Sequence, residues 1–221
     1  MENNFVNTWN DVVKHPNDFF RNMPVSGGYR DPLIFAIVNY IIAAILASVS
    51  SVMQTRTLAE SEVVPEIMVS MSQGMGLLNL VTAPIFNIIG LFIGAAILFV
   101  CFKIMGGSGT YEGTVRIMAY TSIVSVILGI IGIIILLIVP SPLLEQFMQN
   151  DPDMTVIMEY MQYAIYGITL MLIVFVYNVF LLGLGGKYVH ELSMLRSVIG
   201  VLLPGIAMGL LIAVMIIISG T

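Results

Sequence analysis

The sequence predicts an all-α integral membrane protein, a bundle of five transmembrane helices preceded by an interfacial amphipathic region. Three observations lead to this prediction. Hydrophobic residues make up 58% of the 221-residue chain and charged residues only 10%, whereas about 25% of the residues of a soluble domain are charged. A chain of this length cannot enclose so much apolar surface in one core, so lipid must cover most of it. Five apolar runs are also long enough to cross a bilayer, and their interiors hold no ionisable side chain except cysteine and tyrosine.

The five expected spans divide the chain into two parts. Residues 1–32 form the interfacial segment, and residues 33–221 form the five-span domain. The second run exceeds the length that a span needs, so we expect it to tilt, to kink near Pro84 or to begin at the membrane surface. The spans lie at about 33–53, 75–104, 117–139, 162–184 and 197–219.

The basic residues predict the orientation of the chain. Seven of the eight lie in the N-terminal segment and in the second and fourth loops, and Arg56 alone lies in the first loop. Because basic residues concentrate on the cytoplasmic side, this split predicts a cytoplasmic N-terminus and a C-terminus outside. The opposite side is rich in carboxylates, which either hydrate its loops or form a weak site for a hard cation.

The N-terminal segment has the pattern of two short surface helices. Phe5, Trp9 and Val12 recur at helical spacing with polar residues between them, and Pro16 suits the first turn of a second helix. Such helices lie in the headgroup layer with their aromatic side chains inserted. They either anchor and pack under the bundle or offer a docking surface for a cytoplasmic partner.

The sequence offers little that could carry catalysis. Both histidines lie outside the expected spans, and His190-Glu191 lacks the second histidine of a zinc-protease helix. The single cysteine, Cys101, excludes a disulfide framework and a cysteine-based metal site. We therefore expect a non-enzymatic protein with no metal, no cofactor and no nucleic-acid partner; an enzyme that uses His190 and Glu191 is the remaining catalytic alternative.

Neutral polar residues occur within the second span. Asn79 and Asn87 are eight residues apart, so a helix brings them near one face, with Thr82 close to it. They either form hydrogen bonds between helices or line a polar cavity.

Small residues predict close packing of helices. Gly90 and Gly94, like Gly205 and Gly209, are four residues apart, which lets two helix backbones approach closely within one chain or between chains. Two further glycine clusters, at 106–109 and 183–186, are expected to end helices.

The polar surface predicted on the cytoplasmic side is the place to look for a partner. It combines aromatic residues of the N-terminal segment with basic and aromatic residues near the two glycine clusters. The candidates are Trp9, Phe19, Phe20, Tyr111, Arg116, Lys187, Tyr188, His190 and Arg196.

Three blocks of the sequence resemble the Yip-domain family, the Ypt/Rab-interacting five-span membrane proteins, and in particular its prokaryotic members. They are WNDVVKHPNDFF at 9–20, the glycine-rich GGSGTYEGTVRIMAYTS at 106–122 and GLGGKYVHELS at 183–193. The resemblance covers nearly the whole chain and implies the five-span fold and residence in a membrane. The chain lacks the long cytoplasmic N-terminal region of the eukaryotic members, so the resemblance does not imply a Rab-type partner.

These observations favour a membrane adaptor or organiser that engages a partner protein or lipid at its cytoplasmic face. The alternative is a channel, transporter or lipid-handling protein for a neutral or lipid substrate. The bilayer is the expected partner in either case, with another membrane or cytoplasmic protein and an oligomer both possible.

Overall fold

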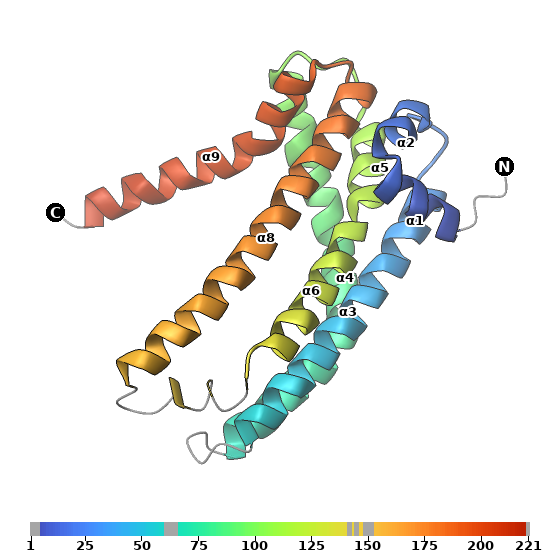
Figure 1. The fold of residues 1–221 in the computed structure, drawn as a ribbon. Coiled ribbons are helices and arrows are strands. Elements are labelled where there is room, and N and C mark those ends of the chain that lie inside the picture. Colours follow the sequence, from blue (N-terminus) through green and yellow to red (C-terminus); the bar gives the residue numbers. More distant parts are fainter. Residues whose placement is uncertain (1–4, 60–65, 141–142, 144–145, 148–152, 220–221) are drawn as a thin grey trace. The chain divides into compact units, whose positions relative to one another are not determined.

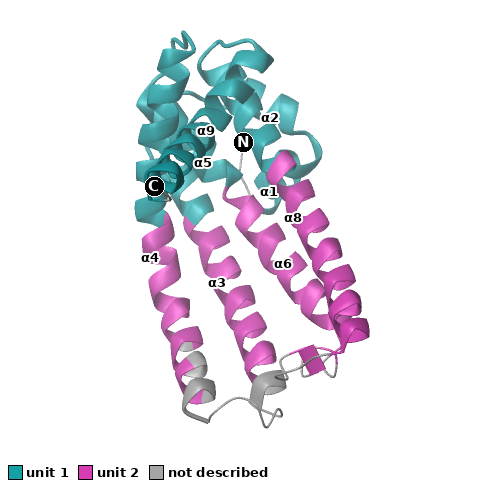
Figure 2. Cartoon of the chain, turned by 90° about the vertical axis from the view of Figure 1, so that its left-hand side faces the viewer, with its two compact units in different colours: residues 1–36, 88–121, 177–221 teal, residues 37–87, 122–176 magenta. Residues whose placement is uncertain are grey.

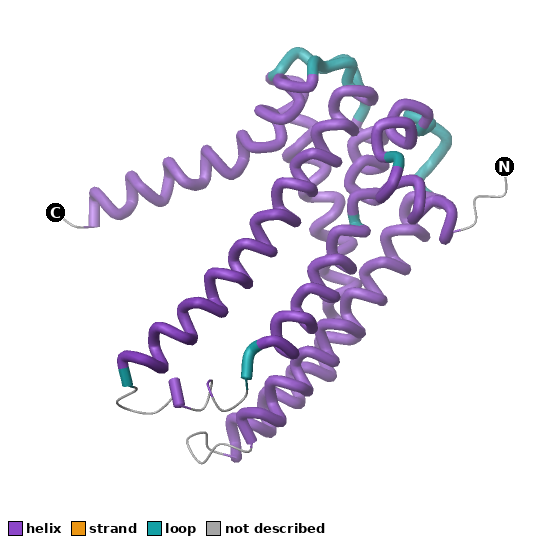
Figure 3. Tube along the Cα trace, in the orientation of Figure 1, coloured by secondary structure: helices purple, strands orange, loops and turns teal. Residues whose placement is uncertain are grey.

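The computed structural model describes residues 5–59, 66–140, 143, 146–147 and 153–219. The described residues form helices joined by short loops, with no strand among them (Figures 1 and 3). In chain order the helices are α1 (Phe5–Lys14), α2 (Pro16–Asn22), α3 (Arg30–Ala59), α4 (Glu66–Ile104), α5 (Tyr111–Thr121), α6 (Ile123–Ile138), α8 (Met154–Val189) and α9 (Met194–Ser219).

Five helical segments are long and apolar enough to cross a membrane, which confirms the predicted all-α five-span fold. The chain is therefore a multi-pass membrane protein. The segments extend beyond most of the predicted runs, because polar residues at a span end continue the helix without adding to the apolar run. They are Arg30–Thr55, Leu78–Ile104, Tyr111–Ile138, Met154–Val189 and Met194–Ser219.

The third span consists of two helices, α5 and α6, which meet at Ser122. The Ser125 hydroxyl donates a hydrogen bond to the Ser122 carbonyl at 2.6 Å, and the Ser125 N–H donates to the same oxygen at 3.0 Å. Serine side chains compete for carbonyls in this way and interrupt the regular helical ladder. The run of apolar residues gave no signal of this interruption.

The long α4 passes through Pro84 without ending. Proline has no N–H, so the carbonyl four residues earlier loses its helical hydrogen bond. The expected overlength is confirmed, because α4 has 39 residues and begins at Glu66.

The N-terminal segment forms two helices, and they separate at His15 as predicted. Pro16 occupies the first turn of α2, where its missing N–H leaves no helical hydrogen bond unmade. The Phe19 N–H donates to the His15 carbonyl at 2.9 Å, which starts the ladder of α2.

The chain divides into two compact units (Figure 2). Unit 1 comprises residues 1–36, 88–121 and 177–221, and unit 2 comprises residues 37–87 and 122–176. Unit 1 therefore holds α1, α2, α5 and α9 together with parts of α3, α4 and α8. All nine candidate partner-surface residues fall within it.

Unit 1 has a well-packed core around its polar residues. Val12, Phe20, Phe102 and Ile117 are almost completely buried. Residues 205–219 of α9, by contrast, are exposed throughout. In Figure 1 they form the end of α9 that leads to the C-terminus. In a bilayer, such an apolar surface faces lipid or another membrane protein.

Several loop carboxylates that suggested a cation site lie outside the described residues, namely Glu60, Glu62, Glu145 and Asp151. Within the described ranges, no group of three or more His, Cys, Asp or Glu side chains could hold a metal ion.

Candidate functional site

His190 lies at the centre of the polar residues of unit 1. Its side chain is completely buried at the C-terminal end of α8. Its backbone N–H donates to the Gly186 carbonyl at 3.0 Å. The ring Nε2 lies 2.8 Å from the Thr114 hydroxyl, and the ring packs on Phe102 with centroids 4.7 Å apart. The other ring nitrogen, Nδ1, is buried and has no hydrogen-bond partner among the described residues.

The surroundings of His190 keep its imidazole neutral. Burial lowers the pKa of His190 from 6.5 to about 4, and the positive charge of Lys103 acts in the same direction. At neutral pH the side chain is therefore a polar group within the core of unit 1. It is not available as part of an exposed contact surface.

Residues 105–110, which we call the glycine loop, are fastened to the chain around His190. The Ser108 N–H donates to the His190 carbonyl at 3.0 Å, and the Ser108 hydroxyl donates to the Glu191 carboxylate at 2.8 Å. The Lys103 ammonium donates to the Ser108 carbonyl at 3.3 Å. Two positive backbone angles shape the connection, φ +89° at Gly106 and φ +55° at Glu191.

Glycine permits the close approach that this fastening needs. A Cβ atom at Gly107 would lie 2.9 Å from the Cβ of His190, and one at Gly109 would lie 2.5 Å from the Val189 carbonyl oxygen. Both contacts are too short for any side chain, so a residue larger than glycine would push the loop off His190.

The two glycine clusters have different roles. The first follows the end of α4, and its expected role in helix termination is confirmed by the positive φ at Gly106. The same expectation for residues 183–186 is wrong, because α8 continues through them to Val189. There a Cβ at Gly185 would overlap Ile117, and a Cβ at Gly186 would overlap Ser197. These glycines bring helices together instead of ending one.

Arg116 ties the N-terminal segment to α5. Its guanidinium is buried and donates to the Pro24 carbonyl at 3.1 Å and to the Gly28 carbonyl at 2.6 Å. It also pairs with Glu112 at 3.2 Å, and Glu112 accepts the Gly28 N–H at 2.8 Å. The pair therefore holds residues 24–28 in place.

Aromatic contacts position the N-terminal helices within unit 1. Phe19 packs edge-to-face on Tyr120 with centroids 4.9 Å apart, and the Tyr188 hydroxyl donates to the Asn17 side-chain oxygen at 2.7 Å. Phe20 is buried beside Phe19. These contacts pack the N-terminal helices against α5 and α8 within unit 1.

The nine candidate partner-surface residues thus divide by exposure. Arg196 is exposed, three are buried, and the rest are half-buried. The buried residues support the surface from below and cannot themselves contact a partner. They are Phe20, Arg116 and His190.

The sequence did not single out Thr114, Ser108 or Glu112, although all three hold this site together. Each lies in or beside the glycine-rich block that carried the family resemblance. Their hydrogen-bonding side chains gave no reason to prefer them over other polar residues nearby.

His190 and Glu191 do not form a shared catalytic arrangement. The imidazole faces Thr114 in the core, while the carboxylate accepts a hydrogen bond from Ser108 in an exposed position. A general base needs access to a substrate proton, and the buried ring lacks that access in this structure.

Unit 2 contains the polar residues of the second span. An open cavity of about 520 Å³ is lined by Asn79, Ala83 and Asn87 of α4, together with small and polar residues of α3 and α6. Thr82 lines a neighbouring cavity of about 560 Å³ with Asn79, and its hydroxyl donates to the Leu78 carbonyl of its own helix at 2.9 Å. All three polar residues therefore line cavities.

Of the four glycines in the predicted packing motifs, one has a close neighbour among the described residues. A Cβ at Gly94 would lie 2.9 Å from the terminal methyl of Met118. Added Cβ atoms at the other three positions, Gly90, Gly205 and Gly209, would have no neighbour within 4 Å among the described residues. The described part of the chain therefore places no packing partner against these three glycines.

Comparison with known proteins identifies the family. The Yip1 domain model matches residues 10–216, and this range includes most of the segment before the first span, the first four spans, nearly all of the fifth and both glycine clusters. No curated protein and no solved structure matches the chain significantly. A match over nearly the whole sequence, on a chain with five membrane-spanning helical segments, shows that this protein belongs to the Yip1 domain family.

Proposed function

We propose that this protein is a non-enzymatic membrane adaptor that engages a partner protein at one polar face built by unit 1. The observation that supports the proposal is the fastening of the glycine loop to His190 and Glu191 through Ser108. A loop held in one conformation loses less entropy on binding than a mobile loop does.

The contact surface consists of the side chains that this framework leaves accessible. Lys103, Glu191 and Arg196 are exposed, and the Lys187 ammonium lies 4.7 Å from the centre of the half-buried Tyr188 ring. Exposed charged residues are typical of the polar rim of a protein–protein interface, and aromatic residues such as tyrosine are enriched within it. The proposal includes no catalytic step.

The proposed surface faces the cytoplasm. The distribution of basic residues, seven on one side and Arg56 on the other, supports this orientation. It places the N-terminus and the glycine loop inside and the C-terminus outside.

Affinity purification from native membranes tests the adaptor role. We expect a partner protein at a near-equal amount, and we expect it to be lost when Lys187→Ala and Arg196→Ala are combined. Arg56→Ala, which also removes one basic side chain but on the opposite side, is the matched control and should retain the partner. Recovery of the chain without any partner, or equal partner loss in the control, would contradict the proposal.

A second function is favoured by the open cavities of unit 2. Asn79 and Asn87 offer amide groups to a ligand within a span, and they lie beside small residues that leave room for it. This arrangement suits passage or binding of a neutral or lipid substrate. Flux or lipid-transfer assays in liposomes, comparing the natural chain with Asn79→Leu and Asn87→Leu, test this alternative: a substrate-dependent signal that both variants abolish would support it.

A further inference from the structure

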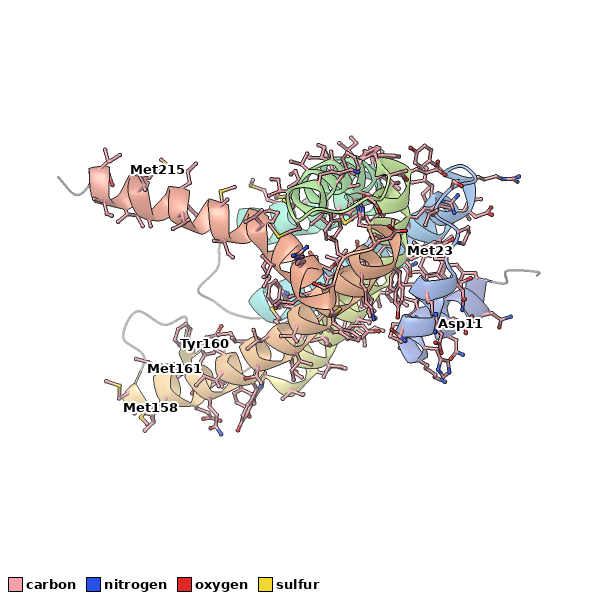
Figure 4. All side chains as sticks on the ribbon, turned by 90° about the horizontal axis from the view of Figure 1, so that it is seen from above. Asp11, Met23, Met158, Tyr160, Met161 and Met215 are labelled. Atoms are coloured by element: carbon pink, nitrogen blue, oxygen red, sulfur yellow. The ribbon has the colours of Figure 1, made fainter. Side chains whose placement is uncertain are left out.

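The cavities of unit 2 are neighbours that share lining residues. The cavity of about 520 Å³, which we call the amide cavity, is lined by residues of α3, α4 and α6, and the cavity of about 560 Å³ shares Ser51 and Asn79 with it. Gln54 lines the amide cavity and also a third cavity of about 410 Å³, to which α8 contributes Tyr160. Figure 4 labels Tyr160 on the ribbon of α8. Polar groups therefore continue from one cavity to the next.

Three amide side chains of the amide cavity are without partners. Gln54, Asn79 and Asn87 lie within the first two spans, and none of them has a hydrogen-bond partner among the described residues. Each amide has one acceptor oxygen and two donor hydrogens. Hydrocarbon cannot satisfy these groups, so a polar group that faces it is disfavoured. The occupant of the amide cavity must therefore form hydrogen bonds.

The two asparagines lie at different depths in the membrane. The Ser48 hydroxyl of α3 donates to the Gly76 carbonyl of α4 at 3.1 Å, which places Asn79 one helical turn from this contact. Asn87 lies eight residues further along the same helix, a distance of about 12 Å. The second span segment begins at Leu78, so Asn87 is near the middle of a hydrocarbon core about 30 Å thick.

This spacing distinguishes a small polar solute from a lipid. A lipid carries its polar groups together at one end, so it would satisfy one asparagine and place hydrocarbon against the other. Water and a small polar solute can reach both. No Asp, Glu, Lys, Arg or His side chain lines any of the three cavities, so a charged solute would find no opposite charge there.

The remaining lining residues leave space and add acceptors. Ala83 lies between the two asparagines and has only a methyl side chain. The hydroxyls of Ser50 and Ser125 donate to the carbonyls of Leu46 and Ser122, so their oxygens can still accept a hydrogen bond. A polyol suits this lining, because each of its hydroxyls both donates and accepts.

We propose that the amide cavity is hydrated and binds a small uncharged polyol. The polyol hydroxyls donate to the amide and serine oxygens and accept from the amide N–H groups, with water in the rest of the cavity. The inference rests on the second function proposed above and deepens it, because it names the substrate as a small polar solute instead of a lipid.

Cysteine labelling of the full chain in liposomes tests whether the amide cavity is hydrated. In a Cys101→Ala background, Ala83→Cys places a thiol in the cavity, and Ile168→Cys places one on an exposed apolar position of α8 in the same unit. Thiols react as thiolates, which form only where water reaches them. We therefore expect iodoacetamide, a small uncharged reagent, to label Ala83→Cys about tenfold faster than Ile168→Cys.

A matched pair of variants connects the hydration to the amides. Adding Asn79→Leu and Asn87→Leu to Ala83→Cys removes two amides from the lining and should lower its labelling rate about tenfold. Asn178→Leu removes an amide from the fourth span that lines neither of the first two cavities, and it should leave the rate unchanged. A thermal melt of each variant shows that the fold is intact, which we expect because Asn79 and Asn87 have no hydrogen bonds to lose.

Protection by glycerol tests the solute class. Glycerol in the cavity competes with iodoacetamide for the same space, so it should slow the labelling of Ala83→Cys as its concentration rises. Dextran at matched viscosity is the control, because the polymer is too large to enter the cavity, and it should not slow labelling to the same extent.

Two outcomes would overturn the inference. Equally slow labelling of Ala83→Cys and Ile168→Cys would show that the cavity is dry, and equal slowing by glycerol and dextran would show that it holds water without binding a polyol. A lipid-transfer signal that needs both asparagines, together with slow labelling of Ala83→Cys, would retain the second function but assign it to a lipid. Labelling that glycerol slows selectively would support the site even without flux in liposomes, so failure of the inference and failure of the second function are distinguishable.

Discussion

At the scale of single residues, His190 joins three elements of unit 1. It lies at the end of α8, its ring meets Thr114 of α5, and its carbonyl receives the glycine loop. The Thr114 hydroxyl has one hydrogen, which it donates to the Thr110 carbonyl at 3.1 Å, so its oxygen can accept a hydrogen bond from His190 Nε2. Protonation of the ring would add a positive charge to the core and a proton at Nδ1, which has no partner among the described residues. The packing of this region therefore depends on a buried ring that stays neutral.

This dependence predicts that acid destabilises the protein through His190. The unfolded chain binds a proton on His190 near pH 6.5, whereas the folded chain keeps the ring neutral down to about pH 4. Between these values the unfolded state holds more protons, so the free energy of unfolding falls as the pH falls. The stability that neutral His190 contributes is complete above pH 6.5 and is lost by pH 4, a change of about 3 kcal/mol.

Thermal melts in detergent at pH 7.5 and pH 4.5 measure this effect. His190→Gln keeps a hydrogen-bonding side chain but does not titrate, so its melting temperature should fall less with acid than that of the natural chain. His15→Gln changes the exposed histidine and should follow the natural chain. Equal acid sensitivity of His190→Gln and the natural chain would contradict the prediction.

At the scale of elements, glycine position decides which helices can meet. Gly185 and Gly186 lie inside α8 and are buried against Ile117, Ser197 and Phe102. Gly205 and Gly209 have the spacing that favours close helix packing, yet no neighbour lies within 4 Å of an added Cβ among the described residues. Spacing along the sequence alone therefore does not show which glycines are contact points.

We predict opposite results for alanine at two of these glycines. Gly186→Ala should lower the free energy of unfolding by about 1–3 kcal/mol, because the new methyl group overlaps Ser197 and Phe102. Gly205→Ala should have no cost or a small gain, because alanine favours a helix and has open space there. Denaturant titration in mixed micelles measures both.

The Gly205→Ala control also reports on oligomers. If Gly205 is a contact between chains, its substitution should cost stability and reduce the size of the particle in size-exclusion chromatography with light scattering. An unchanged particle with unchanged stability would support lipid as the covering of this part of α9.

At the scale of the whole molecule, the five spans and the charge distribution predict which side each loop occupies. The proposed orientation predicts that Thr110 in the glycine loop is inside and that Asp153 before α8 is outside. Both positions are exposed, so a cysteine at either one would be accessible to a reagent on its own side.

Labelling with an impermeant thiol reagent on intact cells tests this orientation. In a Cys101→Ala background, Asp153→Cys should react from outside, whereas Thr110→Cys should react only after the membrane is permeabilised. Reaction at Thr110→Cys in intact cells, with protection at Asp153→Cys, would reverse the orientation and place the proposed partner surface outside.

The sequence by itself determined the class of the molecule. Composition and run length are sums over many residues, so the membrane environment, the five spans and the break at His15–Pro16 follow without knowledge of any contact. The glycine-rich blocks also identified the region around residues 106–122 and 183–193 as a site of interest. Local hydrogen bonding at Ser122, however, divided a span that the apolar pattern showed as continuous.

Only the tertiary structure decided which polar residues are buried and what they contact. Thr114 and His190 are 76 residues apart, and Arg116 and Gly28 are 88 apart, yet both pairs are within hydrogen-bond distance. Burial and pairing depend on neighbours that are distant in sequence. A single sequence records the type of each residue but not those neighbours.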